Sequence, residues 1–362
     1  MDSGISGIST VNVNQMVTLL TNAYTSLIRS GTPLKRFPSV MLWGPPGVGK
    51  SQGIRQVAEQ LERNTGKTVH ITDVRLLLFN PVDLRGIPAA NADKTLAVWL
   101  KPQIFQMDES DRVVNLLFLD EISAAPPSVQ AAAYQITLDR MVGEHRLPEN
   151  CIVIAAGNRV TDKSVAYNMP KALANRLCHL ELREDPQAWH DWAVARGVHP
   201  YVVGFLEYNS YPLMKFEPAS TDLAFPTPRS WEMVSSILNT VSDDLDVVYP
   251  LIAGCIGELT ASTFRGWCSL YANMPSMEAI FSGKSVPAPE AEELQTVLRS
   301  AMVAYARKHP DRDGLDHSID FACGLPFQFR LKLLRDYCRM PEVRPLAELN
   351  EVFQTARKQG YL

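Results

Sequence analysis

Eight consecutive residues near the N-terminus have the types and spacing needed to hold phosphate groups. The segment from Gly44 to Ser51 reads GPPGVGKS and fits the pattern G-x-x-x-x-G-K-[ST]. Glycines at these positions let backbone N–H groups curl around phosphate oxygens, because no Cβ stands in the way. The pattern therefore predicts a site for the phosphates of ATP. Its expected members are Gly44, Pro45, Pro46, Gly47, Val48, Gly49, Lys50, Ser51 and Gln52.

The end of this segment supplies an amine and a hydroxyl with separate tasks. Lys50 is expected to reach the β- and γ-phosphates, and Ser51 is expected to bind Mg²⁺. A helix that begins at Lys50 would also direct its positive N-terminal dipole at the same anion. An apolar strand at 39–43 precedes the segment and an amphipathic helix at 50–63 follows it. A chance match would lack this context.

Two carboxylates follow an apolar run later in the chain. Residues 116–121 read LLFLDE, so a buried strand would present Asp120 and Glu121 at its C-terminal tip. Ligands of parallel sheets bind beyond such tips. Asp120 suits the coordination of Mg²⁺, and Glu121 suits the base that polarises an attacking water. Taken alone, this run is also consistent with an ordinary strand end, but beside a phosphate site it predicts ATP hydrolysis.

Three further polar residues are candidates for the same reaction. Asn158 follows the apolar strand predicted at 151–156, so its amide would lie near the γ-phosphate if that strand neighbours the one ending at Asp120. The alternative is an asparagine that caps the turn. Arg176 and Arg229 carry charge suited to a phosphate, and either could also be an ordinary surface arginine.

The elements that would position these groups alternate along the first half of the chain. Apolar strands are predicted at 39–43, 69–72, 113–119 and 151–156, and helices at 14–29, 50–63 and 128–138. This alternation indicates a parallel sheet covered on both faces. Prolines interrupt it at 80–103, which we interpret as an insertion or a long loop. Residues 141–147 are typical of a short hairpin.

From about residue 186 the strand patterns stop and helical patterns continue to residue 362. Proline-rich stretches at 212–228 and 275–289 divide this region. The predicted fold class is therefore α/β, a P-loop core with a parallel sheet, followed by two helical regions. We expect the core at 1–185, with the insertion at about 80–100 and the hairpin at about 140–148. An all-helical domain would occupy 186–272, and a helical C-terminal extension would occupy 273–362.

Composition limits the class of protein. The 362 residues carry a net charge of −4, which argues against a strong sequence-independent grip on nucleic acid. The six cysteines show neither a CxxC pair nor zinc-ligand spacing, so we expect reduced thiols in a reducing compartment. The N-terminus lacks the pattern of a signal peptide, and no apolar run approaches the roughly 18 residues of a membrane span. We therefore expect a cytoplasmic protein that does not enter a membrane.

With these residues identified, residues 14–270 resemble the AAA+ ATPases, and among them the MoxR-type group. GPPGVGKS is similar to the Walker A motif and LLFLDE to Walker B, while Asn158 resembles sensor 1. MPKALANRL resembles the arginine-finger segment, which implies that Arg176 is donated to a neighbouring subunit. TPRSW resembles the start of the sensor 2 helix, which implies that role for Arg229 and makes 186–272 the lid. Whether Arg229 serves its own subunit or a neighbour stays open.

The resemblance has two departures. Many relatives carry an acidic residue before the finger arginine, whereas this chain reads Ala-Asn-Arg. Arg140, Arg146 and Arg159 therefore remain alternative fingers. Residues 275–362 match no pattern of the family, so their role and the identity of any partner stay open.

The resemblance also implies an assembly and a task. The cofactors would be ATP and Mg²⁺, and the subunits would form a homo-oligomeric ring, most often a hexamer. In relatives, the insertion at 80–100 and the hairpin at 140–148 project toward the central pore or the partner. The output would be remodelling of a client protein by a chaperone, with a von Willebrand A-domain protein as the implied partner. One alternative is a DNA-associated motor, which the acidic net charge disfavours. The other is a nucleotide-gated scaffold that does not hydrolyse ATP, which the intact carboxylates Asp120 and Glu121 disfavour.

Overall fold

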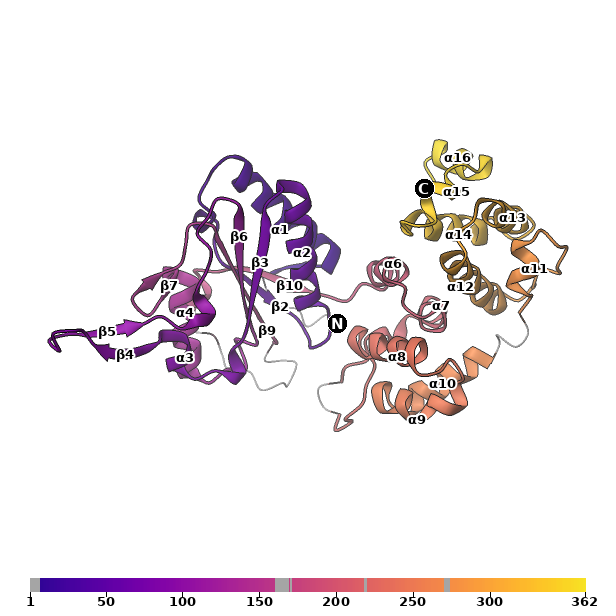
Figure 1. Cartoon of the computed structure of the whole chain (residues 1–362). Helices are drawn as coiled ribbons and strands as arrows, with labels where there is room; N and C mark the ends of the chain where they lie inside the picture. Colours follow the sequence, from indigo (N-terminus) through magenta and orange to yellow (C-terminus); the bar gives the residue numbers. More distant parts are fainter. Residues whose placement is uncertain (1–6, 160–168, 170, 218–219, 270–273) are drawn as a thin grey trace. The chain divides into compact units, whose positions relative to one another are not determined.

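The computed structural model describes residues 7–159, 169, 171–217, 220–269 and 274–362. The chain forms two compact units. Unit 1 comprises Met1–Glu184 and Glu217–Ser220, and unit 2 comprises Asp185–Phe216 and Thr221–Leu362. Figure 1 shows the strands of the chain in unit 1 and a succession of helices in unit 2. Each unit is described by itself below.

Unit 1 is built on a six-stranded sheet in the order β1-β10-β2-β9-β6-β3. Every neighbouring pair in this sheet is parallel. The strands are β1 (Ser9–Val11), β2 (Val40–Trp43), β3 (Thr68–Arg75), β6 (Val113–Asp120), β9 (Cys151–Gly157) and β10 (Cys178–Leu182). Because the strands run in one direction, their carboxyl ends share one edge, where the segments predicted to do chemistry begin.

Helices cover both faces of this sheet (Figure 1). The helices of unit 1 are α1 (Val13–Arg29), α2 (Lys50–Thr65), α3 (Pro81–Arg85), α4 (Pro127–Asp139) and α5 (Lys171–Ala174). Of these, α1 and α2 pack on one face of the sheet, and α3 and α4 pack on the other. Side chains of β6 alternate between the two cores: Leu116 packs with α1 and α2, and Leu117 packs with α4. A continuous apolar strand arises because both of its faces are buried. The α/β fold class with a parallel sheet and a helical second half is confirmed.

Two strands of this sheet were not predicted from the sequence, and a third is longer than predicted. β1 has only three residues, and β10 interrupts its apolar pattern with His179 and Glu181. Neither shows the continuous apolar pattern by which a buried strand is recognised in a sequence. The strand predicted at 69–72 continues to Arg75, where it pairs with Asp120 of β6.

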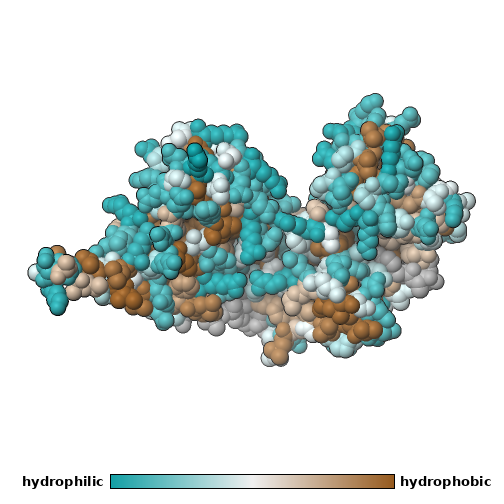
Figure 2. Space-filling model, viewed as in Figure 1, coloured by the Kyte–Doolittle hydropathy of each residue, from teal (hydrophilic) through white to brown (hydrophobic). Residues whose placement is uncertain are grey.

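The segment interpreted as an insertion contains regular structure of its own. It consists of α3 and an antiparallel hairpin of β4 (Ile87–Ala90) and β5 (Ala97–Leu100). Figure 2 shows apolar side chains along this hairpin, where Ile87 is 63% and Leu96 is 67% exposed. A second hairpin, β7 (Met141–Val142) with β8 (His145–Arg146), contacts the first, because Nε2 of His145 lies 2.7 Å from the carbonyl oxygen of Trp99.

The described residues of unit 2 form helices and no strand. The first helices are α6 (Pro186–Arg196), α7 (Pro200–Tyr208), α8 (Pro228–Thr240), α9 (Leu245–Ile256) and α10 (Glu258–Cys268). They are followed by α11 (Met277–Phe281), α12 (Glu292–Lys308), α13 (Arg312–Cys323), α14 (Phe327–Arg339), α15 (Arg344–Ala347) and α16 (Glu351–Lys358). α7 contributes Phe205 to a core with α8–α10 and Val203 to a core with α12–α14. The helices on both sides of residue 272 therefore pack as one compact unit.

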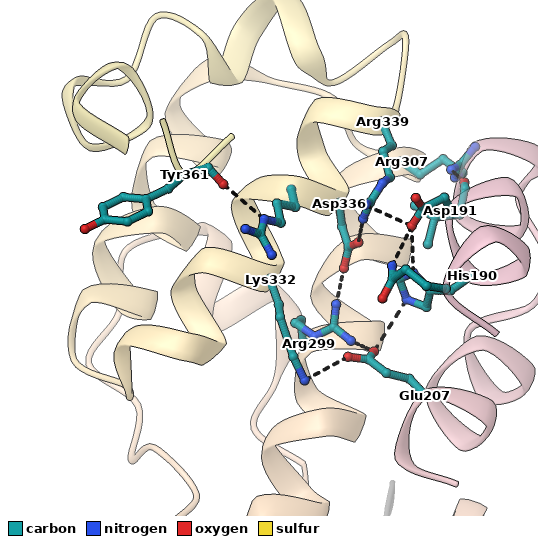
Figure 3. A network of polar contacts seen from close by, with 12 residues as sticks. His190, Asp191, Glu207, Arg299, Arg307, Lys332, Asp336, Arg339 and Tyr361 are labelled. Carbon is teal, nitrogen blue, oxygen red and sulfur yellow. Dashed lines mark hydrogen bonds and ion pairs between the residues drawn. The ribbon is translucent and has the colours of Figure 1, made fainter. Parts of the chain in front are cut away.

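A network of ion pairs joins four helices of this unit (Figure 3). Arg299 of α12 is 3% exposed and pairs with Asp336 of α14 and Glu207 of α7. Further pairs are Lys332–Glu207 at 3.3 Å, Arg339–Asp336 at 3.2 Å and Arg339–Asp191 of α6 at 2.8 Å. The network borders a cavity of about 650 Å³. In the part of the chain that the structure describes, no helix has the length and apolar character required to cross a bilayer.

Candidate functional site

The loop between β2 and α2 requires glycine at two positions. Gly47 has a φ of 84° and Gly49 a φ of 102°, both in the left-handed region that other residues rarely adopt. Gly49 is the N-cap of α2, so the helix begins at Lys50 as predicted. The unpaired N–H groups and the dipole of this helix end make it a ready anion site. Pro45, Pro46 and Val48 complete the loop, and Val48 anchors it in the core beneath.

Lys50 is the cation of this loop, and its side chain is 8% exposed. Its Nζ donates to the carbonyl oxygens of Gly44 at 2.6 Å and Pro45 at 3.1 Å. A third hydrogen bond of 2.9 Å reaches Oδ1 of Asn158. These acceptors are neutral oxygens, which a phosphate can replace as partners of an ammonium group. The amine therefore lies between the loop and the tip of β9.

Ser51 and Asp120 form a pair of oxygen ligands. Oγ of Ser51 donates to Oδ2 of Asp120 over 3.0 Å, joining the first turn of α2 to the tip of β6. A hydroxyl and a carboxylate at this distance fit Mg²⁺, which binds proteins through one or two carboxylates together with substrate phosphates and water. The described residues contain no group of three or more His, Cys, Asp or Glu side chains that would hold a metal alone. The donor set is thus suited to a metal that arrives with a nucleotide. Gln52 lies next along α2 and is half-buried.

Glu121 stands on a sharp turn directly after β6. Its φ of 59° places a non-glycine residue in the left-handed region, which costs about 1–3 kcal/mol and recurs at functional sites. Two hydrogen bonds hold the turn: the Glu121 N–H donates to Oδ1 of Asp120, and the Ile122 N–H donates to the carbonyl of Ala156, both over 2.9 Å. Among the described residues, no donor engages the Glu121 carboxylate. Its oxygens are therefore available to a water molecule.

The backbone of Asn158 is positioned by Ser123, a residue that was not predicted from the sequence. Its backbone N–H donates to Oγ of Ser123 over 2.9 Å. A Cβ on the preceding Gly157 would lie 2.7 Å from the same oxygen, so glycine is required for this close approach. Ser123 is a single serine in a turn, and nothing in its sequence context distinguishes it. Only the meeting of β6 and β9 reveals its contact with Asn158.

Asp73 is a second neighbour that the sequence did not indicate. It lies on β3, opposite Phe118 of β6. Partial burial raises the pKa of Asp73, and the negative charge of Asp120 raises it further, while Arg75 and Arg55 lower it. A third carboxylate therefore stands near Asp120. The strand predicted at 69–72 ended one residue too early to include it.

The two predicted arginines are both exposed, and they belong to different units. Arg176 lies in the turn between α5 and β10 of unit 1. Arg229 is the second residue of α8 in unit 2. Burial raises the pKa of Glu232, one turn further along α8, and Arg229 partly offsets this effect. The structure thus brings Lys50, Ser51, Asp120 and Asn158 together with Glu121 beside them, and it leaves Arg176 and Arg229 on surfaces.

The alternative arginines differ in how they are bound. Arg140 donates to the carbonyl oxygens of Cys151 at 3.1 Å and Phe37 at 3.2 Å, so it joins two segments of its own chain. Arg159 forms an ion pair of 2.6 Å with Glu181, a fully buried residue of β10. Arg146 is exposed on the second hairpin. Of these three, Arg146 has the most accessible guanidinium.

The central part of unit 1 is similar to a known protein family. Residues 39–179 match the family described as the ATPase family associated with various cellular activities (AAA). That segment includes the loop, both carboxylates, Asn158 and Arg176. None of the curated proteins compared with the chain matches it.

Solved structures with similarity to the chain are distant. A mutant of RuvB from Thermotoga maritima is 16% identical with a TM-score of 0.37, and the alignment covers 65% of this chain and 63% of RuvB. A putative ATPase from Cytophaga hutchinsonii ATCC 33406 is 18% identical with a TM-score of 0.34, covering 89% and 88%. PCH-2 from C. elegans is 14% identical with a TM-score of 0.32, covering 83% and 68%. The chain spans less than two thirds of the RuvB structure, and TM-scores this low add nothing about function.

Proposed function

We propose that this chain, whose residues 39–179 form an AAA ATPase domain, binds ATP with Mg²⁺ at the strand tips of unit 1 and hydrolyses it. One observation carries the proposal. Lys50 and Ser51 of α2 make hydrogen bonds to Asn158 and Asp120, which follow or end two different strands. Four side chains selected for phosphate chemistry thus converge although up to 108 positions separate them in the sequence.

Binding uses groups that are already in place. Lys50 exchanges its neutral acceptors for phosphate oxygens, and the N-terminus of α2 stabilises the same negative charge. Ser51 and Asp120 would hold Mg²⁺. When bound, this ion neutralises charge that develops on the phosphate oxygens. Their hydrogen bond keeps the two ligands close together, so little reorganisation is needed.

Hydrolysis requires a base and an oriented water. Glu121 is the base, because the turn after β6 presents its carboxylate beside the Mg²⁺ ligand Asp120. Asn158 orients the water and the terminal phosphate through its side-chain amide. Ser123 keeps the backbone of Asn158 in position for this task. Positioned proton transfer of this kind contributes roughly 10²–10⁴ in rate.

The proposal includes a ring of identical subunits, most simply a hexamer. Arg176 is exposed and makes no hydrogen bond or ion pair with the described residues of its own chain, as a finger offered to a neighbour requires. Such an arginine supplied in trans is worth roughly 10³–10⁵ in rate. Arg229 of α8 would sense the nucleotide state through the lid helices. This part of the proposal rests on the resemblance to MoxR-type AAA+ proteins.

The task of the ring would be to remodel a partner protein, as a MoxR-like chaperone does. The two hairpins support this role, because His145 and Trp99 join them into one surface. That surface exposes Ile87, Leu96 and Leu100, the last at 57%. Apolar side chains this exposed are typical of protein-binding surfaces. A partner with a von Willebrand A domain is the first candidate by resemblance.

Replacing Glu121 with Gln tests the central claim. The E121Q protein should bind a fluorescent ATP analogue within about twofold of wild type, while its turnover should fall by at least about a hundredfold because the base is lost. E109Q, which changes an exposed glutamate of the same unit, is the matched control and should keep full turnover. Equal turnover in E121Q and wild type would remove Glu121 from the base role.

The alternative of a DNA-associated motor predicts a different response. Turnover would then rise strongly on addition of single-stranded or duplex DNA. We expect no stimulation, in keeping with the net charge of −4. Stimulation of tenfold or more, as a rough threshold, would replace the chaperone proposal with the motor.

A further inference from the structure

β10 carries two polar side chains on one face of the sheet. Leu180 and Leu182 point into the core beneath α1 and α2. His179 and Glu181 alternate with them and therefore lie on the opposite face. Glu181 is fully buried, and a buried glutamate requires a specific partner. None of the residues that we place in ATP binding or hydrolysis lies on β10.

The His179 side chain connects two segments with its two ring nitrogens. Nε1 of Trp43 donates to Nδ1 of His179 over 2.9 Å, so Nδ1 is the acceptor. Nε2 of His179 lies 2.7 Å from the carbonyl oxygen of Ala174, so it is the donor. The rings of Trp43 and His179 are nearly parallel, at 18° with centroids 6.1 Å apart. Both hydrogen bonds therefore depend on one orientation and one tautomer of this ring.

The segments joined in this way are those of the nucleotide site and of the exposed arginine. Trp43 directly precedes Gly44, the first residue of the phosphate loop, and Ala174 lies two residues before Arg176. The same strand contacts the loop again at its end, because a Cβ on Gly44 would lie only 2.9 Å from the carbonyl oxygen of Leu182.

Glu181 adds a link to the third part of the site. Its Oε1 accepts from Nη1 of Arg159 over 2.6 Å, and Arg159 follows Asn158 directly. This buried ion pair links the backbone that follows β9 to β10, because separating two buried charges is strongly unfavourable. Side chains of β10 thus contact three residues that neighbour the site. These are Trp43 before the phosphate loop, Arg159 after Asn158, and Ala174 close to Arg176.

We propose that His179 is a positioning residue that couples the phosphate loop of one subunit to the arginine that this subunit presents to its neighbour. The inference rests on the proposed function. A shift of Trp43 with the loop is transmitted through the imidazole to Ala174, and from there to Arg176. The consequence is that His179 acts on hydrolysis in the neighbouring subunit and not in its own.

The first experiment removes both hydrogen bonds and keeps an aromatic ring of similar size. In the full-length H179F protein, kcat should fall by about tenfold to a hundredfold, because a misplaced finger loses most of its effect. Affinity for a fluorescent ATP analogue should stay within about threefold, because the binding groups of the same subunit are untouched. H70F changes an exposed histidine of β3 in the same way and should leave kcat unchanged.

The second experiment asks in which subunit the defect acts. Mixed with K50A, which has no working pocket but an intact Arg176, H179F should regain turnover. Mixed with R176A, which has a working pocket but no finger, H179F should regain none. The opposite pattern, or a kcat for H179F equal to that of H70F, would overturn the proposal.

Two further samples keep the outcome decisive. The reference mixture of K50A with R176A must regain turnover if fingers act in trans, so failure there rejects the ring together with the coupling. If K50A with R176A regains turnover but H179F recovers with R176A and not with K50A, only the proposed role of His179 is rejected. If H179F fails to fold, W43F takes its place, since it removes only the donor to Nδ1. W43F should show the same mixing pattern with a smaller loss of kcat.

Discussion

Two polar clusters of this protein each surround a buried cation, and they differ in the groups that contact it. Arg299 of unit 2 is 3% exposed and pairs with two carboxylates, Asp336 and Glu207. Lys332 pairs with Glu207, and Arg339 pairs with Asp336 and Asp191, so three cations face three carboxylates (Figure 3). This cluster fastens α6, α7, α12 and α14 to one another.

Lys50 of unit 1 is 8% exposed, and the acceptors around its amine include two backbone carbonyls and the Asn158 amide. The nearby carboxylate of Asp120 accepts a hydrogen bond from the Ser51 hydroxyl. Such neutral contacts are easily exchanged for a phosphate and a metal, whereas ion pairs between buried charges are not. The comparison separates a cluster that holds helices together from one arranged to receive a ligand.

The largest effect is expected from breaking the Arg299 cluster. Replacing Arg299 with Met should lower the free energy of unfolding of unit 2 by about 3 kcal/mol, because Asp336 and Glu207 stay buried without their central cation. Lys332 and Arg339 still pair with these carboxylates and limit the loss. Chemical denaturation followed by tryptophan fluorescence would measure it.

Two controls sharpen this prediction. R335M changes an exposed arginine of the same helix as Asp336 and should alter stability by less than about 0.5 kcal/mol. Replacing Arg299, Glu207 and Asp336 together with Met, Gln and Leu should restore most of the stability, because no unpaired buried charge is left. A stable R299M protein would mean that the ion pairs contribute little.

The next effect should appear in catalysis and not in stability. K50M should reduce ATP turnover by at least about a hundredfold, because the amine is the main charge directed at the phosphates. Its free energy of unfolding should change by less than about 1 kcal/mol, because the carbonyl oxygens of Gly44 and Pro45 and Oδ1 of Asn158 are neutral acceptors. K35M, at an exposed surface pair with Glu149, is the control for both measurements. A large loss of stability in K50M would make Lys50 a structural cation like Arg299.

The smallest effect concerns pH and the helical unit. Burial lowers the pKa of His199 to about 4, with Asp243 opposing and Lys308 reinforcing this shift. The unfolded chain therefore takes up this proton first as the pH falls. The stabilising contribution is complete above about pH 6.5 and is lost as the pH falls toward 4, a loss of about 3 kcal/mol.

The substitution H199N isolates this contribution. Asparagine does not titrate, and its side chain can replace Nδ1 of His199 as acceptor from the Tyr201 N–H at the start of α7. Stability curves of wild type and H199N should therefore separate as the pH falls from 7 to about 4.5, because only wild type loses this contribution. Parallel curves would show that His199 does not titrate in this range.

Much of the fold was predictable because its signals are local. The strand at 113–119 is apolar except for Asn115, and the helix predicted at 50–63 appears as α2 at Lys50–Thr65. β10 escaped notice because two of its five residues are polar. Their polarity has a cause that only the sheet supplies, since Trp43 and Arg159 contact them from other elements.

The chain of 362 residues by itself determined the phosphate loop, the two carboxylates after a buried strand and the order of strands and helices. These features depend on residues close in sequence, where backbone conformation and periodicity leave a readable pattern. The tertiary structure decided which groups meet: Lys50 with Asn158, His179 with Trp43, and Arg299 with Glu207 and Asp336. Such pairs join positions far apart in the chain, and their hydrogen bonds and charges are selected by packing, for which no local pattern exists.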